Sequence, residues 1–266
     1  MSTSSTTVRG PAGPIEVLES GEGHPVVMLP SLGRGAADFA ELADALTEAG
    51  HHAIRPEPRG IGGSIGGLEG LTMTDLATDV AAVIHARVGR PVTLVGHAFG
   101  NRVARMTATE FPHLVDSVVL LACGGLVPPA PEHAAALLRV FDVELSDEEH
   151  LAAVDRAFFA PGNDPSVWFD GWYGIVAAAQ GAATRDQPVD HWWGAGGKDV
   201  LVVQPADDVL AVVENAERLV ATDPDRVHMV VVADAGHALL PEQPAAVADA
   251  VLEWLRRRDL GSRGAA

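Results

Sequence analysis

Short apolar runs alternate with helix-like segments along most of the chain. The run PVVMLP at 25–30 is continuously apolar, which is typical of a strand buried on both faces of a sheet. The segment 36–50 then carries apolar residues at helical spacing and ends at Gly50, a residue type favoured just after a helix. The alternation predicts an α/β fold with a mainly parallel central sheet and helices on both faces.

The alternation stops near Leu126 and resumes with a strand over 199–205. Between them, residues 126–194 carry proline clusters, short helical patterns, four of the five tryptophans and the single tyrosine. We therefore expect a core domain formed by 1–125 and 195–266, with a helical cap insertion at 126–194. Ligands of open α/β sheets bind at the carboxyl ends of the strands, so an insertion that leaves from there would cover the binding crevice.

Charge and composition limit the classes of partner. The net charge of −18 disfavours nucleic-acid binding, because an acidic surface repels phosphates. No run approaches the ~18 apolar residues of a membrane span, and the N-terminus has no apolar signal core, so we expect a cytoplasmic protein. The single cysteine, Cys123, allows neither an intrachain disulfide nor a cysteine-based zinc site. We expect a small-molecule substrate, no membrane partner and no metal, and leave a homodimer open.

The stretch Gly96-His97-Ala98-Phe99-Gly100 links a predicted strand to a predicted helix. It has the form of a G-x-S-x-G nucleophile elbow with alanine in place of serine. Such a turn holds its central residue at positive φ and requires small residues two positions away, because strand and helix pass close together. A purely structural turn would favour glycine at the centre. Ala98 is therefore predicted to occupy a nucleophile position from which the oxygen is missing.

Two further residues follow in the chain order nucleophile, acid, base that is typical of such sites. Asp208 comes just after the predicted strand 199–205, and His237 lies in a loop after the last predicted strand. The imidazole would act as the base and the carboxylate would orient it. Asp207 is a rival for the acid, but the motif register favours Asp208.

An oxyanion hole is also predicted. The loop LPSLGRG at 29–35 follows the first apolar strand, and the backbone N–H of Leu32 is expected to point into the crevice. The N–H of Phe99, directly after the elbow position, would be the second donor. Two such donors stabilise a developing oxyanion by roughly 3 kcal/mol each.

The segments LPSLGRGAADF, RPEPRGIGGS, LVGHAFGNRVARM, VVQPADD and ADAGHALLPEQP together resemble those of α/β-hydrolase fold proteins over nearly the whole chain. The resemblance implies one catalytic domain with a helical cap and no cofactor. It places Ala98 at the nucleophile position, Asp208 as acid and His237 as base. Together with the aromatic residues of 126–194, it predicts an esterase or lactonase for a medium-sized apolar or aromatic carbonyl substrate. With Ala98, the chain should be nearly inert as a serine hydrolase.

The role of Ala98 stays open at this point. One explanation is a deliberate Ser→Ala change made to trap substrate. The other is a native alanine, so that His237 and Asp208 activate water directly or move protons in a lyase, isomerase or cofactor-free oxygenation reaction. A third hypothesis is a crevice that binds a small molecule without turnover. Ser31 and Cys123 are weaker candidates for the missing nucleophile.

Three residues are candidate substrate contacts. His97 is either a pocket contact or a packed, hydrogen-bonded residue of the elbow. Trp172 and Trp193 are hypothesised to line a pocket, because ligand pockets are mostly apolar and aromatic. The alternative is that the aromatic residues of 126–194 only form the small core that this segment needs.

Overall fold

The structure is a computed structural model that describes residues 3–185 and 187–264, so residues 1–2, 186 and 265–266 of the predicted domains lie outside it. The described strands form an eight-stranded sheet in the order β1-β2-β4-β3-β5-β6-β7-β8. The six strands from β4 to β8 in this order pair in parallel, and β1 and β2 form an antiparallel hairpin at one edge. The strands are β1 (Ser4–Arg9), β2 (Pro14–Ser20), β3 (His24–Leu29), β4 (His51–Pro56), β5 (Val92–His97), β6 (Val115–Leu121), β7 (Asp199–Pro205) and β8 (Val227–Val232).

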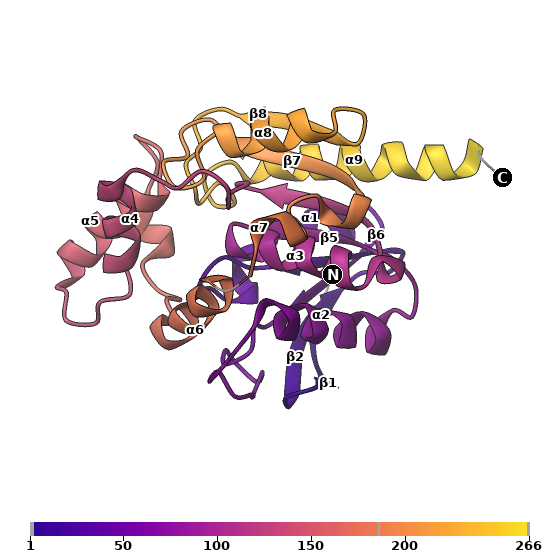
Figure 1. Cartoon of the computed structure of the whole chain (residues 1–266), viewed down its shortest axis with the longest axis horizontal. Helices are drawn as coiled ribbons and strands as arrows, with labels where there is room; N and C mark the ends of the chain where they lie inside the picture. The colour runs from indigo at the N-terminus through magenta and orange to yellow at the C-terminus, as the bar shows by residue number, and fades with distance from the viewer. Residues whose placement is uncertain (1–2, 186, 265–266) are drawn as a thin grey trace.

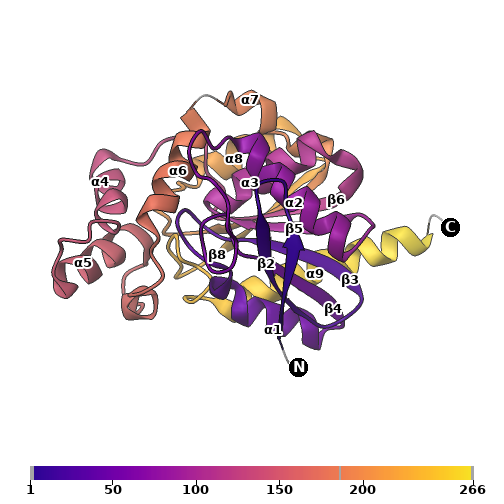
Figure 2. The same ribbon diagram turned by 90° about the horizontal axis from the view of Figure 1, so that it is seen from below.

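Helices cover both faces of this sheet (Figures 1 and 2), which confirms the predicted fold class. Helices α2 (Met73–Arg87), α3 (Phe99–Glu110) and α8 (Glu214–Thr222) lie on one face. Helices α1 (Ala40–Glu48) and α9 (Pro244–Gly264) lie on the other. Successive residues of the fully buried β5 alternate between the two cores, with Leu94 in the first and Val95 in the second. Burial on both faces explains why this strand is a continuous apolar run.

A helical segment separates β6 from β7, where the sequence predicts an insertion over 126–194. It contains α4 (Pro131–Arg139), α5 (Asp147–Phe158), η3 (Pro165–Trp168), α6 (Gly174–Arg185) and α7 (Val189–Trp192). Helices α4 and α5 pack together and project to one side of the sheet (Figure 1). They share an apolar cluster that includes Phe158 and Trp168, while α7 packs against α3 of the main body.

Three short 3-10 helices complete the described elements: η1 (Ala36–Phe39), η2 (Pro112–Leu114) and η4 (Ala195–Gly197). Within residues 3–185 and 187–264, no helix combines the length and the apolar character that crossing a bilayer requires.

Candidate active site

The turn after β5 holds its central residue in a strained conformation. Ala98 has φ 50° and ψ −106°, between the last residue of β5 and the first residue of α3. A non-glycine residue in such a region costs of order 1–3 kcal/mol, which surrounding contacts must offset. The Ala98 N–H donates to the carbonyl of Leu121 on β6 at 2.9 Å, and the Asn101 side chain donates to the carbonyl of Ala122 at 2.9 Å. These bonds fix the elbow to the neighbouring strand.

The glycines of the elbow are there because no side chain fits. A Cβ atom at Gly96 would overlap the backbone of Gly100 and Asn101, and one at Gly100 would overlap the carbonyl of Leu29. The close passage of strand and helix that the motif requires is therefore present.

His237 and Asp208 form a buried pair. The Nδ1 atom of His237 lies 2.9 and 3.0 Å from the two carboxylate oxygens of Asp208. The same carboxylate accepts the backbone N–H groups of Leu210 and Ala211 at 2.9 and 2.7 Å. Burial alone would raise the pKa of Asp208, but the facing imidazole and these hydrogen bonds outweigh it and hold that pKa below its usual value. The structure thus brings Asp208 to His237, whereas the Asp207 side chain is exposed.

The charge state of Asp208 defines the tautomer of His237. An ionised carboxylate only accepts hydrogen bonds, so Nδ1 of His237 carries the proton and donates it to Asp208. The Nε2 atom then has a free lone pair. A neutral imidazole in this tautomer can act as a general base.

The His237 loop is attached to the end of α5. Glu242 accepts the N–H of Gly236 at 2.8 Å through one oxygen and the N–H of Ala160 at 2.7 Å through the other. The Ala238 N–H donates to the carbonyl of Phe158 at 2.8 Å. The loop is packed so closely that a Cβ atom at Gly236 would overlap this backbone. Sequence reasoning missed Glu242, whose role depends on contacts with residues about 80 positions away.

One cavity of about 380 Å³ contains the elbow, the base and the predicted oxyanion donors. Ala98, His237, Leu32 and Phe99 all line it. Its other walls come from the ends of β6 and β7, from the segment between them, and from the loop after β3 and the first turn of α3. The remaining lining residues are Ser31, Arg102, Ala122, Gly124, Gly125, Leu126, Val127, Pro128, Pro129, Leu137, Phe158, Gly181, Thr184, Leu210 and Ala211.

The loop that carries Leu32 is held by α6 and its preceding residue. The N–H of Gly33 donates to the side-chain oxygen of Gln180 at 2.8 Å, and the N–H of Tyr173 donates to the carbonyl of Gly33 at 2.9 Å. Gly33 has φ 60°, and a Cβ atom there would press against Phe141 and Ala177 at 2.8 Å. Only glycine suits both the conformation and the space at this position.

His97 lies behind the base and does not line the cavity. It is fully buried, and its Nε2–H donates to the backbone carbonyl of His237 at 2.7 Å. Burial, with the neighbouring His237 imidazole, lowers the pKa of His97 to about 3, so the ring is neutral. The residue is packed and hydrogen-bonded, and it supports the backbone of the loop that carries the base.

The two tryptophans chosen from the sequence also lie outside the cavity lining. Trp172 packs against Phe158, with ring centroids 4.9 Å apart, and stacks on the Arg34 guanidinium at 4.4 Å. Trp193 is buried in the main core and lies 4.8 Å from the Arg105 guanidinium. Trp193 is thus a buried core residue, and Trp172 is partly buried against the cluster around Phe158. The Cys123 thiol is fully buried, and burial raises its pKa.

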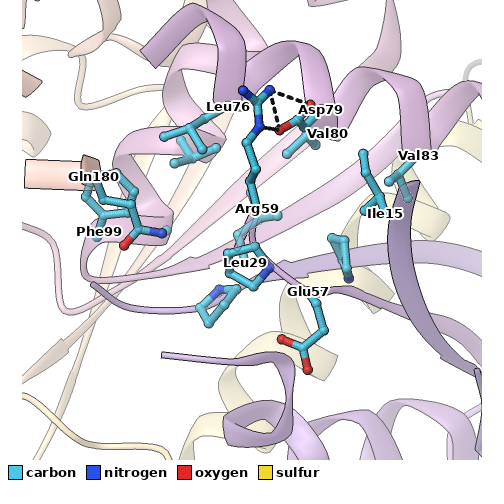
Figure 3. A pocket seen from close by; sticks show the side chains of 15 residues that line it. Ile15, Leu29, Glu57, Arg59, Leu76, Asp79, Val80, Val83, Phe99 and Gln180 are labelled. Atoms are coloured by element: carbon cyan, nitrogen blue, oxygen red, sulfur yellow. Dashed lines mark hydrogen bonds and ion pairs between the residues drawn. The ribbon is translucent and has the colours of Figure 1, made fainter. Parts of the chain in front are cut away.

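A second, smaller cavity of about 50 Å³ lies on the other side of Phe99, between α2 and the start of the Leu32 loop (Figure 3). The paired side chains of Arg59 and Asp79 stand beside it, 2.8 Å apart, and its lining includes neither Ala98 nor His237. Within the described residues, no group of three or more His, Cys, Asp or Glu side chains is arranged to hold a metal ion.

Comparison with known proteins gives consistent matches. The model of the "Alpha/beta hydrolase family" matches residues 26–250. "Putative carbamate hydrolase RutD" of Variovorax paradoxus is 36% identical over 107 residues, 40% of each chain, so the match spans two fifths of that relative's length. A "Carbendazim hydrolyzing esterase" of Nocardioides sp. is 28% identical over 167 residues, 57% of this chain and 66% of the relative. The crystal structure of "Putative non-heme bromoperoxidase BpoC" from Mycobacterium tuberculosis aligns with a TM-score of 0.77 at 25% identity, covering 91% of this chain and 96% of the other.

Proposed function

Because the chain belongs to the alpha/beta hydrolase family, we propose that its 380 Å³ cavity binds a medium-sized ester or lactone with a largely apolar or aromatic body. The observation that carries the proposal is one cavity lined by His237, by the elbow residue Ala98 and by the two residues expected to donate to an oxyanion, with Asp208 bonded to His237 from behind. This arrangement supports a site for a carbonyl substrate in which position 98 offers no nucleophile oxygen. The cytoplasmic location expected from the sequence remains a prediction.

The chemistry follows from the hydrogen-bonding capacity of each group. With a hydroxyl at position 98, Nε2 of His237 would take its proton as the oxygen attacks the substrate carbonyl carbon. The N–H groups of Leu32 and Phe99 would hold the resulting oxyanion, and the imidazolium would return the proton to the leaving alkoxide. Asp208 would stabilise the imidazolium through Nδ1. Water would then hydrolyse the acyl-enzyme by the same proton transfers.

The methyl group of Ala98 cannot form an acyl-enzyme. The remaining groups still position the substrate and stabilise the oxyanion, and His237 still has Nε2 available to deprotonate a water molecule. Hydrolases that lose a triad member keep roughly 10³–10⁴-fold catalysis over water. We therefore propose that this chain binds its carbonyl substrate and hydrolyses it slowly.

The test is the variant Ala98→Ser, assayed beside the parent chain on short p-nitrophenyl esters. We expect kcat/KM to rise by at least about 10³-fold, as the reverse of the loss seen when a triad nucleophile is removed. The matched control is the double variant Ala98→Ser/His237→Asn, which should lose that gain. Equal rates in the parent and the serine variant, or a gain that survives loss of the imidazole, would reject the proposal.

A second candidate function is favoured by one observation: the His237–Asp208 pair is intact although position 98 offers it no hydroxyl. In this case His237 acts as a base directly on the substrate, in a lyase, isomerase or cofactor-free oxygenation reaction. The parent chain would then turn over its own substrate at least as fast as Ala98→Ser. Tight binding of a ligand without turnover by either form would instead favour a small-molecule receptor or carrier.

A further inference from the structure

Arg102 is the cavity-lining residue with a permanent charge. It lies on α3 one helical turn after Ala98, and the other described lining residues are apolar, glycine, serine or threonine apart from His237. The cavity wall contains no carboxylate, because Asp208 stands behind His237. Within the described lining, a single guanidinium thus stands among mostly apolar and small residues.

Among the described residues, this guanidinium has no counterion. Within the part of the chain that the structure describes, Arg102 forms no ion pair and no side-chain hydrogen bond. Carboxylates are not scarce, since the chain has 36 acidic and 18 basic residues. The buried Arg34 pairs with Asp38 at 2.7 Å, and Arg59 pairs with Asp79 at 2.8 Å. Among the described residues Arg105, fully buried on the same helix, also has no carboxylate partner, so the feature particular to Arg102 is an unpaired guanidinium at the wall of this cavity.

The surroundings of Arg102 favour the arrival of an anion. Burial lowers the pKa of its guanidinium, which reflects the poor solvation of the charge there. Two groups interact with it electrostatically: the Cys123 thiol, which stays neutral because burial raises its pKa, and the guanidinium of Arg105. One turn further along α3, Arg105 is fully buried and bonds to the Asn101 side chain and the Gly124 carbonyl, which are uncharged acceptors.

We propose that Arg102 binds a carboxylate group of the substrate, so that the substrate is an ester or lactone that also carries a free carboxylate. This inference rests on the proposed function of the same cavity. The planar guanidinium fork matches a carboxylate through two parallel N–H···O bonds, and such charge-assisted bonds are the strong ones in a poorly solvated site. A lysine ammonium or an uncharged side-chain donor at position 102 would not form these two parallel charged hydrogen bonds.

Ala98 and Arg102 lie close together at the start of α3 and line the same cavity. Ala98 and Arg102 are four residues apart, which places them on the same side of α3, about 6 Å apart along its axis. Because both residues line the same cavity, we expect the carboxylate and the ester carbonyl to be joined by a spacer short enough to fit within it. A half-ester of a short dicarboxylic acid has this form.

The test compares two ligands that differ in one charge, glutaric acid monomethyl ester and its neutral dimethyl ester, by calorimetric titration of the parent chain. Binding does not require turnover, so this readout is independent of the Ala98→Ser assay. We expect the half-ester to bind more tightly than the diester. In Arg102→Gln its Kd should rise about 10- to 100-fold, the range for losing hydrogen bonds to a charged group, with the diester unaffected. Arg102→Lys should restore part of the affinity.

The control variant is Arg256→Gln on the exposed face of α9, which removes the same charge away from the cavity. It should leave the Kd of both ligands unchanged. Thermal unfolding of Arg102→Gln shows whether this variant is folded. If it is not, Arg102→Lys serves in its place, because it keeps the positive charge but not the planar guanidinium fork. The proposal is overturned if the half-ester and the diester bind equally, if neither binds up to tens of millimolar, or if Arg102→Gln and Arg102→Lys weaken both ligands alike.

Discussion

Glu242 joins the loop of the base to the end of α5, and its removal should affect stability and catalysis separately. Its carboxylate accepts the N–H of Gly236 at 2.8 Å, the N–H of Ala160 at 2.7 Å and the side-chain N–H of Asn163 at 2.7 Å. Hydrogen bonds to a charged group contribute about 1.5–3 kcal/mol each, but bonds that share one carboxylate are not additive. Because Glu242 is half-buried and water can replace part of this set, we expect Glu242→Ala to cost about 2–4 kcal/mol.

The catalytic effect is measured in the Ala98→Ser background. Loss of the anchor lets the Gly236–His237 backbone shift, and misplacement of a catalytic group by about 1 Å costs up to 10²-fold. We expect kcat to fall at least about 10-fold with little change in KM, because the cavity walls remain. Urea unfolding gives the change in the free energy of unfolding, and steady-state kinetics give the change in kcat. Glu253→Ala is the control, because Glu253 pairs only with exposed arginines on α9. A change below about 0.5 kcal/mol with unaltered kcat would refute the reasoning.

Two more outcomes are expected. The pKa of Asp208 is lowered in the folded state, so its contribution to stability is present above its unfolded pKa of about 3.9 and is lost as the pH falls through its folded pKa. The free energy of unfolding should therefore fall more steeply below about pH 4 in the parent than in Asp208→Asn. Equal slopes in the two proteins would contradict this prediction. Gln180→Ala removes the acceptor for the Gly33 N–H, and the buried donor left behind should cost about 1–3 kcal/mol in urea unfolding, with a lower kcat in the Ala98→Ser background. A stable Gln180→Ala variant with unchanged kcat would show that the Leu32 loop does not need this anchor.

The parts of the fold set by local pattern were predictable from the sequence. Burial on both faces makes the parallel strands continuous apolar runs, and the two glycines around Ala98 report the close approach of β5 and α3. Parallel strands bring their carboxyl ends to one edge, so residues that follow different strands meet there. For that reason Ala98, Asp208 and His237 could be named before their contacts were known.

The residues that sequence reasoning missed act over long separations or through helix phase. Gln180 bonds to a loop 147 positions away and Glu242 to a residue 82 positions away, and neither carries a local signature. Aromatic content indicated burial for Trp172 and Trp193 but not which core each residue joins. Arg102 could have been predicted to lie near the elbow residue, because it stands four positions after Ala98 in the sequence, at the start of the helix.

The links of Gly33 to Gln180 and of Gly236 to Glu242 set a rule for redesigning this protein. The segment between β6 and β7 cannot be exchanged as a free module, because a replacement segment without an equivalent of Gln180 would release the loop that carries Leu32, a proposed oxyanion donor. Wall positions such as Leu137 and Thr184 line the same cavity but do not anchor either loop. Altered substrate preference should therefore be sought at the walls, with the anchors left in place.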